Sequence, residues 1–408
     1  MKGRGSLPDD FDFDPFNPAS FEDPYPAYAL LREHAPAYRR PNAEARVWPH
    51  FWLITRARDV NDALADWKTF SSATGTLIDT DISLIPPNIF NMDPPRHDEL
   101  RAILARVLTP ARVASLEQGV RQSAAAILEP LLTNGRFDVA TQYSQLIPTL
   151  TMCELMDLPT SDRERFLGWN MDTLAGNDFT SDAALRAYDE MGNYWTGLVA
   201  ERRVRRGDDL ISQILHNQGD VSPLSDEEIG GFCSLLHDAS QNTTMNMIAG
   251  GLIALAEHPD ERRKLVADPS RWPHALDEIL RYVSPVQGLA RSATQDVEIG
   301  GETIPAGDQV LLCYGSANHD PTVFEDPDVL KLERDAKNHW SFGHGIHFCL
   351  GNAVARLETR IALDVLTDRI PDYTIAPDSI VRNQLVPTRG ISQAPIEFDP
   401  RMNRESRI

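Results

Sequence analysis

The chain has 408 residues, of which 42% are hydrophobic, and its formal net charge at pH 7 is −21. This hydrophobic content is enough for a large core, yet no run of about eighteen apolar residues occurs, so the sequence predicts no transmembrane helix. The acidic charge argues against nucleic acid as a partner, because binding to phosphates depends on a positively charged surface.

The N-terminal stretch, residues 1–24, has no apolar segment behind its first basic residues, which excludes a secretory signal. We expect residues 1–20 to form a surface arm and the protein to be cytoplasmic. No linker, internal repeat or low-complexity tract divides the sequence, so we predict a single domain over residues 1–408.

Helical patterns begin early in the chain. A helix is predicted over 23–35, where Asp23 is a candidate N-cap and Pro24 takes the first helical position. A short β signal follows at 51–55. A second helix is predicted over 110–132, because this stretch opens with proline and carries apolar residues at helical spacing.

The most informative helix starts at Ser225, which forms a capping box with Glu228, and stops at His258-Pro259. It is about 45 Å long at a rise of 1.5 Å per residue, long enough to cross a domain of this size. Its middle, HDASQNTT (237–244), is polar where a core helix should be apolar. A local conflict of this kind tends to mark a functional site.

Two further β signals lie at 297–314 and 391–398, and the pair Gly300-Gly301 makes the first of them a hairpin candidate. Since helical signals dominate the rest of the chain, the predicted fold class is mainly α with a minor β-sheet region.

Four cysteines are spread along the sequence without a CxxC pair, so neither a disulfide framework nor a four-cysteine zinc site is indicated. Cys153, Cys233 and Cys313 each lie among apolar residues and are interpreted as packing residues. Cys349 differs, because it lies in the glycine-rich stretch SFGHGIHFCLG (341–351) just before a predicted helix.

Three kinds of chemistry use such a cysteine. A zinc site would draw its ligands from His339, His344, His347 and Cys349, but their spacing is crowded and His339 and His344 are more simply loop or surface residues. A nucleophilic cysteine would need a base and an orienting partner, which the sequence does not locate. A thiolate ligand to haem iron accounts for more. Glycines let the backbone approach a flat macrocycle, and helix-start amides stabilise a charged sulfur.

The stretch FGHGIHFCLG (342–351) resembles the cysteine-ligand loop of the cytochrome P450 superfamily. Other stretches resemble further parts of this family, and they occur in the family's order between about residue 20 and residue 398: DPPRHDELR (93–101), ASQNTT (239–244), EILR (278–281), LARSATQDVEIGG (289–301) and FEDPDVLKLER (324–334).

The resemblance implies a cytochrome P450 fold, with haem b between the long helix and the loop that carries Cys349, the expected iron ligand. It implies these haem contacts: His97, Arg101, Arg291, Phe342, His347 and Gly351. Charged donors among them would offset the desolvation of the haem propionates. Glu278, Arg281 and Arg334 would form a buried structural cluster, since a buried ion pair needs further partners.

By the same resemblance, Thr243 would act in proton delivery while O2 is cleaved. Its usual acidic neighbour is replaced by Asn242, which does not titrate, and the usual glycine of the groove is replaced by Ser240. Asp238 lies one turn before Asn242. Asp238 could relay protons through Asn242, recognise a polar or cationic group of the substrate, or simply pair with His237 or an arginine.

The implied reaction inserts one oxygen atom from O2 into a hydrophobic small molecule, by hydroxylation or oxidative dealkylation. The pocket walls are expected to come from 76–90, 169–174 and 386–388. The expected substrate contacts are Leu235, Asp238, Ala239, Val286, Leu289 and Thr388. These residues are mainly apolar, which suits a hydrophobic ligand.

Electrons would come from a separate ferredoxin with its NAD(P)H-dependent reductase, since the sequence shows no flavin or iron–sulfur segment. An acidic ferredoxin would dock on a basic patch built from Arg106, Arg112, Arg356 and Arg360. A monomer is the family expectation. The alternatives are a peroxide-driven or rearranging haem-thiolate enzyme, which the loss of the acid at Asn242 favours, and a haem-binding sensor or carrier without turnover.

Overall fold

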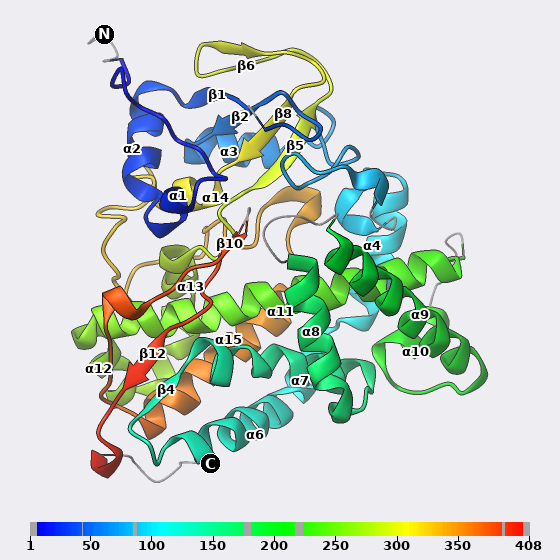
Figure 1. Ribbon diagram of the computed structural model, residues 1–408, viewed down its shortest axis with the longest axis vertical. Helices are drawn as coiled ribbons and strands as arrows, with labels where there is room; N and C mark the ends of the chain where they lie inside the picture. The colour runs from blue at the N-terminus through cyan, green and yellow to red at the C-terminus, as the bar shows by residue number, and fades with distance from the viewer. Residues whose placement is uncertain are drawn as a thin grey trace.

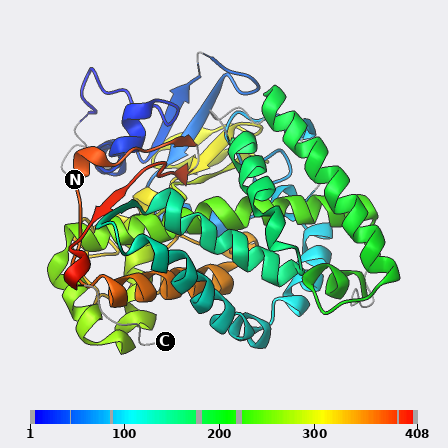
Figure 2. The ribbon, with the colours of Figure 1, turned by 60° about the horizontal axis from the view of Figure 1, so that its bottom comes forward.

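The computed structural model describes residues 6–42, 44–84, 88–174, 181–216, 223–385 and 388–402. The protein is mainly α-helical with a smaller β region, as the sequence predicts (Figure 1). Most of the labelled strands lie beside the N-terminal helices at the top of Figure 1, whereas β4 (Arg136–Asp138) and β12 (Pro395–Glu397) lie at its lower left. Helices make up the larger remainder (Figures 1 and 2).

The largest sheet has the strand order β1-β2-β8-β5-β3. Only the β2–β8 pairing is parallel, with Trp52 opposite Val310. The strands of this sheet are β1 (Ala37–Pro41), β2 (His50–Ile54), β3 (Phe70–Ser71), β5 (Leu289–Ala293) and β8 (Gln309–Leu312). The signal at 51–55 therefore becomes a central strand, β2.

The stretch 297–314 divides into two units. Its first part is the expected hairpin, in which β6 (Val297–Ile299) pairs with β7 (Glu302–Ile304) across Gly300 and Gly301, both at positive φ. Its second part, β8, leaves the hairpin and joins the large sheet. The remaining strands are β4 (Arg136–Asp138), β9 (Thr374–Ile375) and β12 (Pro395–Glu397) in one sheet, and β10 (Gln384–Leu385) with β11 (Thr388–Arg389) in another.

The prediction of one continuous helix over 110–132 is wrong. This stretch forms α5 (Pro110–Ser115), α6 (Glu117–Leu128) and a 3₁₀ turn, Glu129–Leu131. The break follows from the backbone at Leu116, whose N–H bonds to the carbonyls of Val113 and Ala114 instead of continuing the i→i−4 ladder. Leu116 is itself buried in the core, so packing outweighs the helical pattern here.

Near the N-terminus, α1 (Pro18–Glu22) precedes α2 (Tyr25–His34). Pro24 is the N-cap of α2 and not its first residue, and the Asp23 carboxylate accepts a hydrogen bond from the Tyr25 N–H at 3.3 Å. The segment before α1 packs on this helix through Phe13, whose ring lies 5.3 Å from that of Tyr28. The N-terminal segment is thereby held against the sheet region.

The long helix α11 (Asp226–Glu257) runs across the middle of the molecule (Figure 1). Both hydrogen bonds of the predicted capping box are present, between the Ser225 hydroxyl and the Glu228 N–H and between the Glu228 carboxylate and the Ser225 N–H. Around α11 lie α7 (Leu146–Met156), α8 (Arg163–Leu174), α9 (Asp182–Val204), α13 (Trp272–Val283) and α15 (Asn352–Arg369).

Every residue of α11 from Thr244 to Leu255 is buried, so the C-terminal half of this helix is the centre of the helical core. The other helices are α3 (Ala57–Ala65), α4 (Arg96–Val107), α10 (Leu210–His216), α12 (Pro259–Ala267) and α14 (Tyr314–Asn318). Among the helices described, none combines the length and the apolar character needed to cross a membrane.

Candidate functional site

The loop around Cys349 has a conformation that requires its glycines. Gly343 and Gly345 have φ values of +68° and +70°, in the left-handed region that favours glycine. A Cβ on Gly345 would also lie 2.2 Å from the Leu64 carbonyl oxygen. The loop is closed by a hydrogen bond from the Cys349 N–H to the Phe342 carbonyl at 2.9 Å.

The sulfur of Cys349 lies at the N-terminus of α15. Burial raises the pKa of its thiol, whereas hydrogen bonds from the N–H groups of Gly351 and Asn352 and the charge of Arg101 act in the opposite direction. These donors are what a thiolate ligand needs, since N–H groups at a helix start stabilise negative charge.

Packing brings this loop to the long helix. Cys349 contacts a cluster of buried apolar residues that contains Phe342 from its own loop and Met247 from α11. One turn before Met247 lies Thr243, whose hydroxyl donates to the Ala239 carbonyl at 2.7 Å. This apolar cluster thus joins the cysteine loop to α11 one turn beyond Thr243.

The residues of the polar run of α11 (237–244) differ in how deeply they are buried. His237, Gln241, Asn242 and Thr244 are buried, whereas Asp238, Ser240 and Thr243 are partly exposed and Ala239 is exposed, although the helix is central. The polar run is therefore partly packed into the core and partly accessible to solvent.

Four basic side chains from three parts of the chain converge beside the cysteine loop: His97, Arg101, Arg291 and His347. The rings of His97 and His347 are 4.5 Å apart, and the Arg101 guanidinium donates to the Phe348 carbonyl at 2.6 Å. Burial lowers the pKa of His347 to about 3, and the positive charges of Arg291, His97 and Arg101 act in the same direction.

The basic cluster has one carboxylate beside it, that of Asp98, whose Oδ1 lies 2.8 Å from His97 Nδ1. In the part of the chain that the structure describes, no carboxylate is paired with Arg101, Arg291 or His347. The Nε2 atoms of His97 and His347 are buried and have no hydrogen-bond partner among the described residues. Because buried polar atoms are normally satisfied, this arrangement fits an anionic group such as the two propionates of haem.

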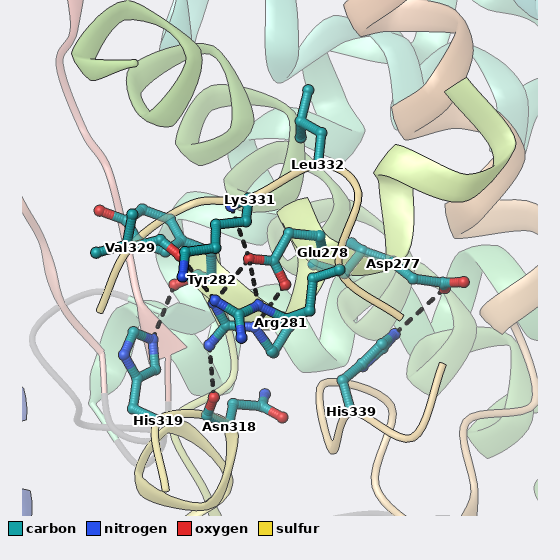
Figure 3. Close-up of polar contacts among 12 residues, drawn as sticks. Asp277, Glu278, Arg281, Tyr282, Asn318, His319, Val329, Lys331, Leu332 and His339 are labelled. Atoms are coloured by element: carbon teal, nitrogen blue, oxygen red, sulfur yellow. Dashed lines mark hydrogen bonds and ion pairs between the residues drawn. The ribbon is translucent and has the colours of Figure 1, made fainter. Parts of the chain in front are cut away.

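Glu278 and Arg281 of α13 form a fully buried ion pair with an Nε–Oε2 distance of 2.7 Å (Figure 3). Glu278 also accepts from Arg334 Nε at 3.0 Å and from the Lys331 N–H at 3.0 Å. Arg281 donates onward to the Asn318 carbonyl at 2.7 Å. Each charge of the pair therefore has further hydrogen-bond partners, which a buried ion pair needs.

The histidines considered for zinc do not assemble a metal site. Among the described residues, no group of three His, Cys, Asp or Glu side chains could hold a metal ion. His344 is exposed in its loop, as expected for a loop residue. The prediction of a surface position is wrong for His339. It is buried, accepts from the Ser341 N–H at 3.1 Å and lies 3.7 Å from Asp277 (Figure 3).

Asp238 pairs with its neighbour. Its Oδ1 lies 2.9 Å from His237 Nδ1, and the other ring nitrogen of His237 lies 3.0 Å from the Phe166 carbonyl. Among the described contacts, the Asn242 side chain makes no hydrogen bond to His237 or Asp238. Asn242 Oδ1 instead accepts from Asn246 Nδ2 at 3.1 Å, so the described contacts show no link from Asp238 through Asn242.

The other expected substrate contacts lie on several elements. Leu235 is half-buried on α11, Leu289 begins β5, and Val286 forms an isolated antiparallel bridge with Thr388. Of the expected pocket walls, residues 85–87 and 386–387 lie outside the described residues.

Sequence reasoning missed Glu358 on α15. This carboxyl is buried, hydrogen-bonded to the hydroxyls of Thr151 and Thr244, and burial raises its pKa to about 8. A signal was present, since Glu358 lies three residues from both Ala355 and Ile361 on the apolar face of α15.

Comparisons with known proteins agree with this geometry. The cytochrome P450 family model matches residues 273–368. The vitamin D(3) 25-hydroxylase of Pseudonocardia autotrophica is 35% identical over 95% of this chain and 97% of its own length. The solved structure of the polyketide synthase cytochrome P450 PksS from Bacillus subtilis has a TM-score of 0.89 at 32% identity, covering 95% of this chain and all of its own.

A further solved structure, that of CYP109E1 from Bacillus megaterium in complex with testosterone, has a TM-score of 0.83 at 29% identity. It covers 93% of this chain and 99% of its own. The likeness to known proteins thus extends over nearly the whole chain and is not confined to the cysteine loop.

Proposed function

Because this chain belongs to the cytochrome P450 family, we propose that it is a monooxygenase that takes its electrons from a separate ferredoxin with an NAD(P)H-dependent reductase. The observation that carries the proposal is Cys349 at the N-terminus of α15, with N–H groups directed at its sulfur and a basic cluster beside it. When bound, haem b with a thiolate ligand supplies the cleavage of the O–O bond of O2.

We assign a role to each of the expected haem contacts. Cys349 would hold the iron, with Phe342 and Gly351 enclosing its sulfur. His97, Arg101, Arg291 and His347 would hold the propionates, which would satisfy the orphaned Nε2 atoms of both histidines. Glu278, Arg281 and Arg334 would fix the segment that leads to the cysteine loop, a structural task.

On α11, we assign proton handling to Thr243. Its hydroxyl hydrogen is engaged by the Ala239 carbonyl, so its oxygen lone pairs remain available to accept a hydrogen bond. Asn242 adjoins it as an amide that does not titrate. Proton delivery would therefore rely on Thr243 and on water, with Asn242 holding that water by a hydrogen bond.

The proposed substrate is a bulky hydrophobic small molecule that undergoes hydroxylation or oxidative dealkylation. Two of the relatives are named for such compounds, a vitamin D(3) hydroxylase and a polyketide biosynthesis enzyme. Leu235, Ala239, Val286, Leu289 and Thr388 would line the pocket. We further propose one domain over residues 1–408, a monomer in the cytoplasm.

The test of the haem-thiolate assignment is spectroscopic. Purified protein, reduced and exposed to carbon monoxide, should show the strongly red-shifted Soret band of a cysteinate-ligated haem. Cys349→Ser should lose this band, whereas Cys153→Ser, at a buried packing position, should keep it. An unchanged spectrum in Cys349→Ser would refute the assignment.

A second measurement separates the classes of enzyme. The holoenzyme should form product with ferredoxin, its reductase and NAD(P)H. Product formed only with hydrogen peroxide would instead indicate the peroxide-driven alternative, for which the amide of Asn242 is the favouring observation. Haem binding without product in either assay would indicate a sensor or carrier.

A further inference from the structure

His237 and Asp238 form a coupled polar pair on α11. The His237 side chain is completely buried and its ring is surrounded by those of Phe166, Trp169 and Trp195, with centroid distances of 6.0, 5.9 and 6.5 Å. The Asp238 side chain is 23% exposed. A buried imidazole therefore supports a carboxyl group that solvent can reach.

The hydrogen-bond partners fix how many protons this pair holds. The Phe166 carbonyl only accepts, so His237 Nε2 must carry a hydrogen to bond with it at 3.0 Å. His237 Nδ1 and Asp238 Oδ1 are 2.9 Å apart, a contact that also needs a hydrogen between them. Whichever atom owns that hydrogen, the pair as formed has no net charge. α8 supplies the anchoring carbonyl, and it crosses α11 in Figure 1.

The orientation of Asn242 is fixed by an independent contact. The Ile391 N–H, which can only donate, bonds to Asn246 Oδ1 at 2.8 Å. Asn246 must then present its Nδ2 to Asn242 Oδ1, at 3.1 Å. The oxygen of Asn242 is thereby engaged by Asn246 and its NH₂ group remains, so Asn242 offers a ligand a donor, whereas a ligand hydroxyl that donates needs an acceptor.

Asp238 supplies that acceptor, at a distance from the residue proposed to handle protons. Side chains on a helix lean toward its N-terminus, so the Asp238 carboxylate lies over the turn that contains Leu235. Thr243 is five residues further on, about 7.5 Å along the helix axis. Asp238 is therefore directed away from Thr243 and toward the turn that contains Leu235, one of the expected substrate contacts.

We propose that Asp238, held in place by His237, is the hydrogen-bond acceptor for a hydroxyl group of an otherwise apolar substrate. This inference rests on the proposed function and names the substrate class: a neutral hydrophobic alcohol. A cation is disfavoured because the pair is already neutral, so an added ammonium group would meet no uncompensated negative charge. His237 acts as a positioning residue, because it touches Asp238 and not the ligand.

The test is a binding titration of the holoenzyme with three probes of equal chain length. The probes are 1-dodecanol, dodecyl methyl ether, which lacks the O–H donor, and dodecyltrimethylammonium, which carries a charge. The readout is the dissociation constant from the optical shift on displacement of water from ferric iron. A hydrogen bond to the Asp238 carboxyl group corresponds to a preference of about 10-fold for the alcohol over the ether.

In Asp238→Leu this preference should fall to less than about 2-fold, while binding of the ether is retained or improved. Asp226→Asn, an exposed carboxylate in the first turn of the same helix, is the matched control and should keep the wild-type preference. His237→Gln should shift binding toward dodecyltrimethylammonium, because the carboxylate then lacks its buried partner.

Three outcomes would overturn the inference: equal binding of alcohol and ether by the wild type, a preference that survives in Asp238→Leu, or tighter binding of the trimethylammonium probe than of the alcohol. The carbon monoxide spectrum of each variant is recorded first. Loss of the cysteinate-type band in the wild type would refute the proposed function, whereas a normal band with any of these outcomes would refute only the task given to Asp238.

Discussion

Glu358 is a single carboxyl group enclosed by α7, α11 and α15, with threonine hydroxyls as its partners. No basic side chain pairs with it among the described residues, and burial raises its pKa to about 8. A neutral carboxylic acid can donate one hydrogen bond and accept another, so Thr151 and Thr244 suffice to satisfy it. At neutral pH this residue therefore acts as a hydrogen-bonding link between helices and not as a charge.

The pH dependence of stability follows from this shift. Between about pH 4.5 and 8 the folded protein keeps the Glu358 proton that the unfolded chain releases, so its contribution to stability is lost as the pH rises. The slope is up to about 1.4 kcal/mol per pH unit. Glu358→Gln should remove this slope from the urea-unfolding free energy of the holoenzyme measured between pH 5 and 8.

The matched control is Glu227→Gln, an exposed carboxylate on α11, which should leave the pH dependence as in the wild type. An identical slope in Glu358→Gln and in the wild type would show that Glu358 is ionised in the folded protein at neutral pH.

At the scale of elements, α13 and α15 approach α11 closely at two of its glycines. A Cβ on Gly250 would lie 2.5 Å from Val283 Cγ1 of α13, and one on Gly251 would lie 3.1 Å from Leu363 Cδ1 of α15. These two glycines therefore set the separation of the helices on both sides of the core. Around Gly230 on the same helix, no described atom outside its chain neighbours and the nearby helix backbone lies within 4 Å of an added Cβ.

The contrast between Gly250 and Gly230 gives both a prediction and its control. Gly250→Ala should destabilise the protein by about 1–3 kcal/mol, because the added methyl group overpacks against a stiff valine. Gly230→Ala should stabilise it by up to about 1 kcal/mol, because alanine loses less conformational freedom in a helix. Urea-unfolding midpoints of the two variants measure both effects. A similar change in the two variants would contradict the close approach of α11 and α13.

At the scale of the whole molecule, the net charge of −21 makes any local positive surface important for an acidic redox partner. The four arginines expected to form such a surface do not contribute equally. Arg356 is ion-paired with Asp277, and Arg360 is 3.0 Å from Glu117, so both are largely neutralised. Arg112 instead donates to the backbone carbonyls of Asp208 and Leu155, which leaves its charge uncompensated by those contacts.

We therefore expect Arg112→Gln to lower the second-order rate of reduction by an acidic ferredoxin several-fold at low salt. The difference should vanish near 1 M salt, where charges interact over only about 3 Å. The double variant Glu117→Gln with Arg360→Gln keeps the local net charge and should retain the wild-type rate. Stopped-flow reduction across a salt series measures this, and an unaltered low-salt rate in Arg112→Gln would rule out docking through that residue.

The sequence by itself determined what depends on neighbours along the chain. The capping box at Ser225, the turn at Gly300-Gly301 and the glycine-rich loop around Cys349 are local patterns, so each was readable before folding. The family resemblance followed from the same loop together with stretches such as 278–281. Local pattern failed at 110–132, where burial of Leu116 breaks the helix.

Only the tertiary structure decided the burial, the hydrogen-bond partners and the protonation of the polar side chains. The amide of Asn242 is oriented by Asn246, which is itself held by an N–H 145 residues beyond Asn246. His237 is anchored by a carbonyl 71 residues earlier in the chain. Burial of Glu358 and His339 likewise depends on distant elements. The physical reason is that protonation and hydrogen-bond direction depend on the three-dimensional surroundings of a group, which sequence spacing does not specify.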